Sequence, residues 1–145
     1  MNAADRLVRA AAYQAFIDGD RRPDLGALAN TTGFDSKTVG AALQHLAAER
    51  RLVLTADGRY VAMAHPFSSA ETGYRAVIGD RSWCANCGWD AFAILALLGD
   101  GEAHGVSPVD STTTTWTVGN GKVSPGGLVH FVVPARSFWD DIEFT

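Results

Sequence analysis

The sequence of 145 residues holds only two cysteines, Cys84 and Cys87, which lie three positions apart. Two close thiols do not form the disulfide framework that stabilises small secreted proteins. A structural zinc site would need two further ligands, and the four histidines are scattered along the chain. The cysteines therefore indicate thiol chemistry, a redox pair or plain core packing rather than a cross-linked or zinc-bound scaffold.

Long hydrophobic runs and a targeting segment are also missing from the chain. No run approaches the roughly 18 apolar residues that a membrane-spanning helix needs. Residues 1–6 lack the order of basic and then apolar residues that marks a signal peptide. These absences predict a cytoplasmic protein with no membrane partner.

Positive charge is scarce, and the formal net charge is −4 at pH 7. Residues 1–63 carry eight basic and seven acidic side chains, whereas residues 64–145 carry four basic and nine acidic ones. Neither half has the basic excess that drives binding to phosphates. Nucleic acid is therefore not an expected partner, and the sequence also has no P-loop or dinucleotide-binding motif.

Residues 1–63 have the pattern of three helices followed by a hairpin. Apolar side chains recur at helical spacing in residues 3–17, 25–31 and 35–50. An Asp-Gly pair at residues 57–58 then separates two short apolar runs, which is a strong hairpin signal. This order predicts a winged-helix-like module at the N-terminus.

The third helix of a helix-turn-helix module often enters the major groove of DNA. Its solvent-facing residues here would be Ser36, Lys37, Gln44 and His45. Because this surface has little positive charge, we expect the module instead to pack on the rest of the chain and to help shape a pocket.

The remainder of the chain predicts a small α+β domain. Residues 64–73 should be a linker, since Pro66 cannot continue a helix. A strand is expected at residues 74–78, and one apolar and therefore buried helix is expected at residues 84–98, ending at Gly99.

β-branched and aromatic residues are frequent in the C-terminal part. They predict strands at residues 112–118 and 128–133, a turn at 119–121 and a turn or short helix at 138–142. The expected fold is α+β: a winged-helix-like module, a linker, and a domain over residues 74–145. In that domain a small mixed or antiparallel sheet would pack on the buried helix.

Cys87 and Asp90 are the candidate catalytic residues. They stand three positions apart, so they share one face if both lie on the predicted helix. Cys87 would lie near the first turn, where the helix dipole and free N–H groups favour a thiolate. Thiolates bind soft metals, and a carboxyl group beside a metal–carbon bond can protonate the departing carbon. The pair therefore indicates cleavage of a bond to a soft metal.

A structural explanation of the same residues stays open. Cysteine is among the most buried residue types, so Cys84 and Cys87 are also consistent with ordinary core packing. Asp90 argues against plain core packing, because burying an acid within an apolar helix costs free energy unless the acid has a partner or a function. A redox pair formed by the two thiols is a further alternative. His65 lies in the expected linker, where it could be a ligand or a pocket residue. A histidine in a loop is more often neither.

Residues 86–91 (NCGWDA), followed by an apolar helix, resemble the active-site segment of the organomercurial (alkylmercury) lyases. Residues 129–145 (VHFVVPARSFWDDIEFT) resemble a later segment of the same family. The resemblance implies that Cys87 is the first catalytic cysteine and that Asp90 is the catalytic acid. It also implies a small, winged-helix-like N-terminal part.

The chain departs from the family pattern in its cysteines. The family's second catalytic cysteine lies downstream of the tail motif, and this sequence ends at Thr145 before any such residue. The lyase-like domain is therefore expected to be incomplete. Cys84 occupies a position usually held by an aromatic residue, and it is the candidate second thiol for mercury.

We therefore expect organomercurial lyase-type protonolysis of the carbon–mercury bond, which releases a hydrocarbon and Hg(II). Cys87, with Cys84, would hold the mercury of substrate or product, and no cofactor is expected. The partners would be a small organomercurial substrate and small thiols, or a mercury-accepting protein, that remove the product. Two alternatives remain: a winged-helix regulator that senses mercury or thiol oxidation through Cys84 and Cys87, and an inactive relative of the lyases.

Overall fold

Three helices with polar caps open the chain. In the computed structural model, which describes residues 1–107, 109–128, 131 and 133–142, they are α1 (Ala3–Asp18), α2 (Leu25–Thr32) and α3 (Ser36–Ala48). Each begins after a residue whose side chain accepts a hydrogen bond from a backbone N–H of the first turn, namely Asn2, Asp24 and Asp35. The three helices pack on one another around an apolar core that includes Val8, Leu28, Val39 and Leu46. The predicted helices are therefore present, with ends that differ by at most two residues.

The predicted hairpin follows the helices. β1 (Val53–Leu54) pairs antiparallel with β2 (Val61–Ala64), and the Asp-Gly pair lies in the turn between them. β2 pairs in turn with β3 (Phe67–Ser68), which gives a small sheet in the order β1-β2-β3. The sequence did not indicate β3, because a strand of two residues is too short to show alternation.

The first half of the segment expected as a linker, residues 64–73, is buried at Ala64, Pro66, Phe67 and Ser68, whereas residues 70, 71 and 73 are exposed. Phe67 of β3 is 1% exposed and stacks on Phe16 of α1 at a ring-centroid distance of 5.8 Å. It also meets the ring of Tyr13 edge-on at 6.3 Å. On its other side Phe67 forms a β-bridge with Ala85. This segment therefore joins the helical part to the rest of the chain through buried contacts.

Polar contacts also hold α1 against β5 (Arg81–Cys84). Trp83 Nε1 donates a hydrogen bond to the carbonyl oxygen of Ile17 at 3.1 Å, and the Arg81 guanidinium donates to the same oxygen. Just after α1, Arg21 forms an ion pair with Glu71. The two hydrogen bonds to Ile17 satisfy a carbonyl group at the end of α1, where helix C=O groups otherwise lack partners.

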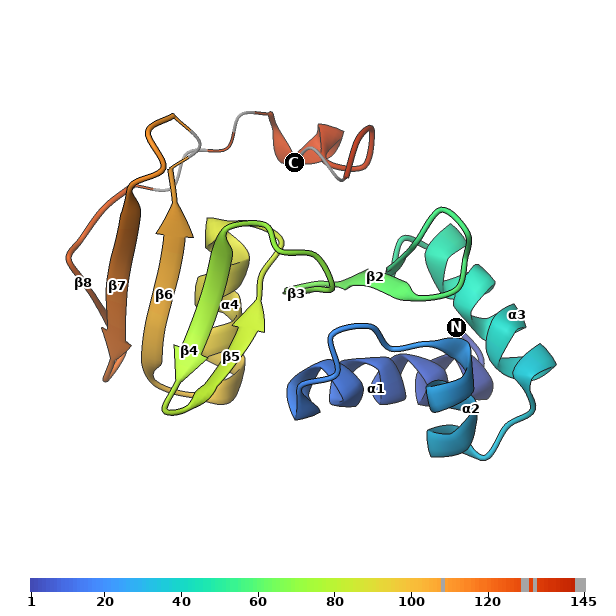
Figure 1. Ribbon diagram of the computed structural model, residues 1–145. Coiled ribbons are helices and arrows are strands. Elements are labelled where there is room, and N and C mark those ends of the chain that lie inside the picture. Colours follow the sequence, from blue (N-terminus) through green and yellow to red (C-terminus); the bar gives the residue numbers. More distant parts are fainter. Residues whose placement is uncertain (108, 129–130, 132, 143–145) are drawn as a thin grey trace.

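A five-stranded antiparallel sheet forms the other part of the molecule (Figure 1). Besides β5, its strands are β4 (Tyr74–Ile78), β6 (Gly101–Val106), β7 (Thr113–Gly119) and β8 (Lys122–Ser124), in the spatial order β5-β4-β6-β7-β8. One helix, α4 (Gly88–Leu98), packs on β4 and β6. The α+β fold class is confirmed, and every pairing in this sheet is antiparallel.

The central strand β6 was not predicted from the sequence. It contains Gly101 and Gly105, and glycine is rare in strands. A Cβ atom on Gly101 would lie 2.2 Å from the carbonyl oxygen of Val77 in β4, so no larger residue fits there. The close approach of β4 and β6 therefore explains why position 101 is a glycine. The same glycine weakens the strand pattern of residues 101–106 in the sequence.

α4 begins four residues later than predicted and is buried on one side only. Cys84 ends strand β5, and Cys87 is the N-cap of the helix. The sheet covers one face of α4, while Trp89 and Leu97 on other faces are 56% and 64% exposed. At 11 residues α4 is too short to cross a bilayer, and no other helix among the described residues has the length and apolar character to do so.

The C-terminal segment lies across the top of the view in Figure 1, between the sheet and the helical part. The strand predicted at residues 128–133 is not formed at Leu128, Phe131 or Val133, and its other positions lie outside the described residues. A short 3-10 helix, η1 (Ala135–Ser137), is followed by turns through residue 140. This agrees with the predicted turn or short helix in the tail.

Replacement of Phe67 should be strongly destabilising. Phe67→Ala removes a buried ring from the contact between α1 and β3, and it should lower the free energy of unfolding by about 3–5 kcal/mol. Leu97→Ala, on the exposed face of α4, should change it by less than about 0.5 kcal/mol. Urea unfolding followed by circular dichroism measures both. Equal losses in the two variants would contradict the placement of Phe67 in the core.

Candidate active site

The candidate site lies where the chain turns from β5 into α4. Cys87, the N-cap of α4, has extended backbone angles and a partly buried thiol. Asp90 lies in the first turn of the helix, three residues farther on. The N–H groups of Asp90 and Trp89 lie close enough to the sulfur to favour its charged form, although neither makes a full capping hydrogen bond. The turn thus places a thiol and a carboxylate together at a helix N-terminus.

Burial raises the pKa of the Cys87 thiol above its ordinary value. The nearby N–H groups oppose this shift, but the negative charge of Asp90 and a hydrogen-bonding interaction between its carboxylate and the thiol add to it. Burial and the carboxylate therefore favour the protonated thiol. The backbone N–H groups at the start of α4 favour the thiolate, as expected, but burial and the neighbouring carboxylate outweigh them.

Asp90 is surrounded by polar groups, and its side chain is 16% exposed. Asn86 Nδ2 donates a hydrogen bond to Asp90 Oδ2 at 3.0 Å. His65 Nδ1 lies 3.7 Å from the same oxygen. We call these four residues, Cys87, Asp90, Asn86 and His65, the Cys87 cluster.

The sequence did not indicate a role for Asn86, and it favoured a plain loop position for His65. His65 is held by Tyr13, whose hydroxyl donates to the His65 carbonyl oxygen at 2.9 Å, and its ring meets Trp139 edge-on at 6.0 Å. In the described part of the chain, His65 Nε2 and Asn86 Oδ1 are buried without a hydrogen-bond partner. Unpaired buried polar atoms are uncommon, and they often lie at functional sites. The only sequence signal for Asn86 was its place in the motif at residues 86–91.

Cys84 has contacts of its own. It lies opposite Arg75 in the β4–β5 ladder and is 7% exposed. Arg21 Nη2 donates to the Cys84 sulfur at 3.0 Å, and the thiol donates to Glu71 Oε2 at 3.6 Å. A cavity of about 80 Å³ borders Cys84, and Cys87 does not line it. The two thiols therefore have different surroundings, and they do not occupy successive turns of one helix as the sequence suggested.

Within the described residues, no group of three or more His, Cys, Asp or Glu side chains is arranged to hold a metal ion. The Cys87 cluster offers one thiol with a carboxylate beside it. Such a pair suits a soft metal that arrives on a substrate, because the thiol can bind it while the carboxylate handles the proton.

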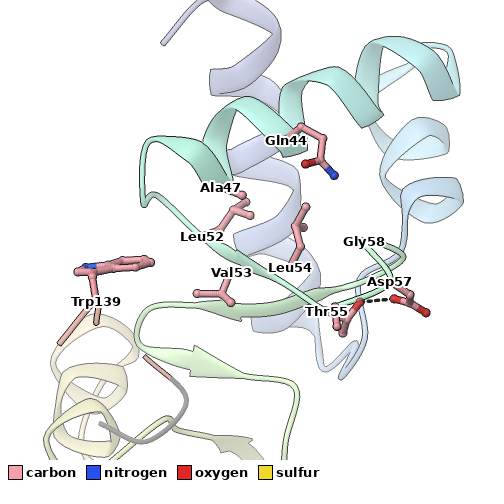
Figure 2. Close-up of a pocket in the computed structure, with 10 residues that line it drawn as sticks. Gln44, Ala47, Leu52, Val53, Leu54, Thr55, Asp57, Gly58 and Trp139 are labelled. Atoms are coloured by element: carbon pink, nitrogen blue, oxygen red, sulfur yellow. Dashed lines mark hydrogen bonds between the residues drawn. The ribbon is translucent and has the colours of Figure 1, made fainter. Parts of the chain in front are cut away.

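A larger groove of about 420 Å³ lies between α3 and the β1–β2 hairpin (Figure 2). It is lined by Gln44, Ala47, residues 52–58 and Trp139. No member of the Cys87 cluster lines this groove, although the Trp139 ring also meets His65. The groove is therefore a separate feature from the candidate active site.

Comparison with known proteins gives a structural match. No family model matches the sequence, and the search of curated proteins found no match. Among the nine solved chains that match is the crystal structure of the mercury-bound form of MerB2, with a TM-score of 0.65 and 25% sequence identity. The fold is MerB-like. The match covers 86% of this chain, which spans 59% of the MerB2 chain.

The effect of Asp90 on Cys87 can be measured directly. Asp90→Asn removes the negative charge beside the thiol and should lower the pKa of Cys87. The rate of alkylation by iodoacetamide as a function of pH, in a Cys84→Ser background, reports this pKa. Asp80→Asn, in the exposed β4–β5 turn, makes the same charge change elsewhere and should leave the profile in place. An unchanged profile in Asp90→Asn would contradict the described geometry.

Proposed function

We propose that this chain is an organomercurial lyase-like enzyme, which cleaves the carbon–mercury bond by protonolysis and releases a hydrocarbon and Hg(II). The observation that carries the proposal is the Cys87 thiol beside the Asp90 carboxylate, in a fold similar to that of mercury-bound MerB2. The motif at residues 86–91, which resembles the active-site segment of the organomercurial lyases, contains both residues.

In the first step the Cys87 sulfur attacks the mercury of a substrate R–Hg–X. The sulfur–mercury bond forms, the mercury–X bond breaks with its electron pair on X, and the Asp90 carboxylate takes the thiol proton. Burial, which raises the pKa of the free thiol, keeps this proton on sulfur until mercury replaces it. The proton therefore enters the reaction only when substrate is bound.

In the second step the Asp90 carboxyl group gives this proton to the carbon atom on mercury. The carbon–mercury bond breaks, its electron pair forms the new carbon–hydrogen bond, and the hydrocarbon leaves. Hg(II) stays on the Cys87 sulfur, and Asp90 is a carboxylate again. Two small thiols, or a mercury-accepting protein, then take the Hg(II), and one of their protons returns to Cys87. No cofactor takes part in this scheme.

Release of hydrocarbon tests the proposal. With excess small thiol, the protein should convert phenylmercury to benzene, which gas chromatography detects. Cys87→Ser should abolish turnover, and Asp90→Ala should slow it by about 10²–10⁴-fold, the usual contribution of a general acid, while mercury still binds. Asp80→Ala is the matched control and should keep the rate. Full activity of Cys87→Ser would refute the assignment of the nucleophile.

Cys84 is the proposed second thiol for the product, since the soft Hg(II) ion has a strong preference for sulfur ligands. To reach the metal, Cys84 would have to leave Arg21 and Glu71. We expect Cys84→Ser to weaken retention of Hg(II), measured as the concentration of competing small thiol that strips half of the metal. Retention equal to that of the unsubstituted protein would leave Cys87 as the sole protein thiol on mercury.

A further inference from the structure

Asn86 connects three parts of the candidate site through one nitrogen atom. Asn86 Nδ2 lies 3.2 Å from the carbonyl oxygen of Pro66, 3.0 Å from Asp90 Oδ2 and 3.2 Å from His65 Nδ1. These partners come from the turn between β2 and β3 and from the first turn of α4. The Asn86 side chain therefore bridges the two parts of the molecule at the point where the thiol lies.

The orientation of the Asn86 amide follows from its partners. The Pro66 carbonyl and the Asp90 carboxylate only accept hydrogen bonds, so both require the NH₂ group of Asn86. A reversed amide would place oxygen against oxygen at both contacts. The orientation leaves Asn86 Oδ1 buried and without a partner among the described residues, which is destabilising. An apolar residue would avoid this cost but would leave the Pro66 carbonyl and the Asp90 carboxylate without their donor, so these two contacts account for an amide at this position.

We propose that Asn86 is a positioning residue that holds the Asp90 carboxylate against the Cys87 thiol. The role of Asn86 in carbon–mercury cleavage rests on the proposed function. Its hydrogen bond to Asp90 is independent of that function. With Asp90 Oδ2 fixed by the amide, the carboxylate stays where it can take the thiol proton and return it to the departing carbon. Without the amide, the carboxylate would be free to turn toward solvent.

A neutral donor suits this task better than a cation. Elsewhere in this chain Arg21 and Arg75 hold Glu71 and lower the pKa of its carboxyl group to about 2, which makes it a poor proton acceptor. The hydrogen bond to Asp90 comes from an uncharged amide. The amide fixes the position of the carboxylate without the full positive charge that would suppress proton uptake.

Asn86 Nδ2 also lies 3.2 Å from His65 Nδ1, and this ring nitrogen lies 3.7 Å from Asp90 Oδ2. The amide therefore lies between the histidine of the β2–β3 turn and the same carboxylate.

The test uses Asn86→Leu and Asn86→Ala in a Cys84→Ser background, without any organomercurial. Asn86→Leu keeps the branching of the side chain at Cγ and removes both the unpaired oxygen and the NH₂ donor, and urea unfolding checks that the variant stays folded. In both variants the alkylation profile of Cys87 should move to lower pH, toward that of Asp90→Asn. In an Asp90→Asn background the same Asn86 substitutions should add no further shift, because Asn86 acts through Asp90.

Thr72→Val is the matched control for a general loosening of the turn. Thr72 Oγ1 donates to the carbonyl oxygen of Ala85, next to Asn86, and has no contact with Asp90 among its hydrogen bonds. Thr72→Val should leave the alkylation profile in place. The inference is overturned if the profile stays or moves to higher pH in both Asn86 variants, if Thr72→Val shifts it equally, or if the shift persists in Asp90→Asn.

Turnover of phenylmercury separates the inference from the proposed function. If the protein is active, Asn86→Leu should lower kcat with little change in KM, because the substrate still reaches Cys87 while proton transfer is misaligned. An equal loss confined to KM would overturn the positioning role. If the unsubstituted protein releases no benzene, the proposed function fails, and the alkylation profiles still decide whether Asn86 positions Asp90.

Discussion

The position of the Cys87 sulfur relative to the backbone N–H groups of α4 depends on where this helix begins. Had the helix started at Cys84, Cys87 would lie within its first turn, with its backbone N–H directed along the helix axis. Because β5 runs to Cys84 and the helix starts at Gly88, Cys87 is the N-cap, and its sulfur lies near both the helix N–H groups and Asp90. Burial and the carboxylate together raise the pKa of the thiol, which suits the proposed proton transfer on metal binding.

Local signals predicted the N-terminal part well. The caps at Asn2, Asp24 and Asp35 and the Asp-Gly turn are each decided by interactions within a few residues, so the sequence alone located three helices and a hairpin. Cys87 and Asp90 were also identified as a pair, since three-residue spacing keeps them adjacent whether the first is a cap or a helical residue. What they do stays a proposal, supported by the motif and the MerB-like fold.

Features set by distant contacts were not predictable from one sequence. Gly101 of β6 lies close to β4, and Phe67 of β3 packs on Phe16 of α1, and neither contact can be read from the local sequence. The apolar run before Gly99 indicated a fully buried helix, yet the sheet covers only one of its faces. Asn86 and His65 meet across 21 positions of sequence, a distance at which no spacing rule applies.

Residues 64–68 contact both the helical part and the sheet, so a cut in this segment would separate residues that contact one another. His65 and Pro66 belong to the helical part, whereas Asn86, Cys87 and Asp90 belong to the part that contains the five-stranded sheet. Phe67 packs between the two parts. The surroundings of Cys87 and Asp90 therefore depend on residues from both parts of the chain. A graft that transferred only the β5–α4 turn to another protein would carry Cys87 and Asp90, the proposed nucleophile and acid, but would lack His65 and Pro66, which Asn86 contacts.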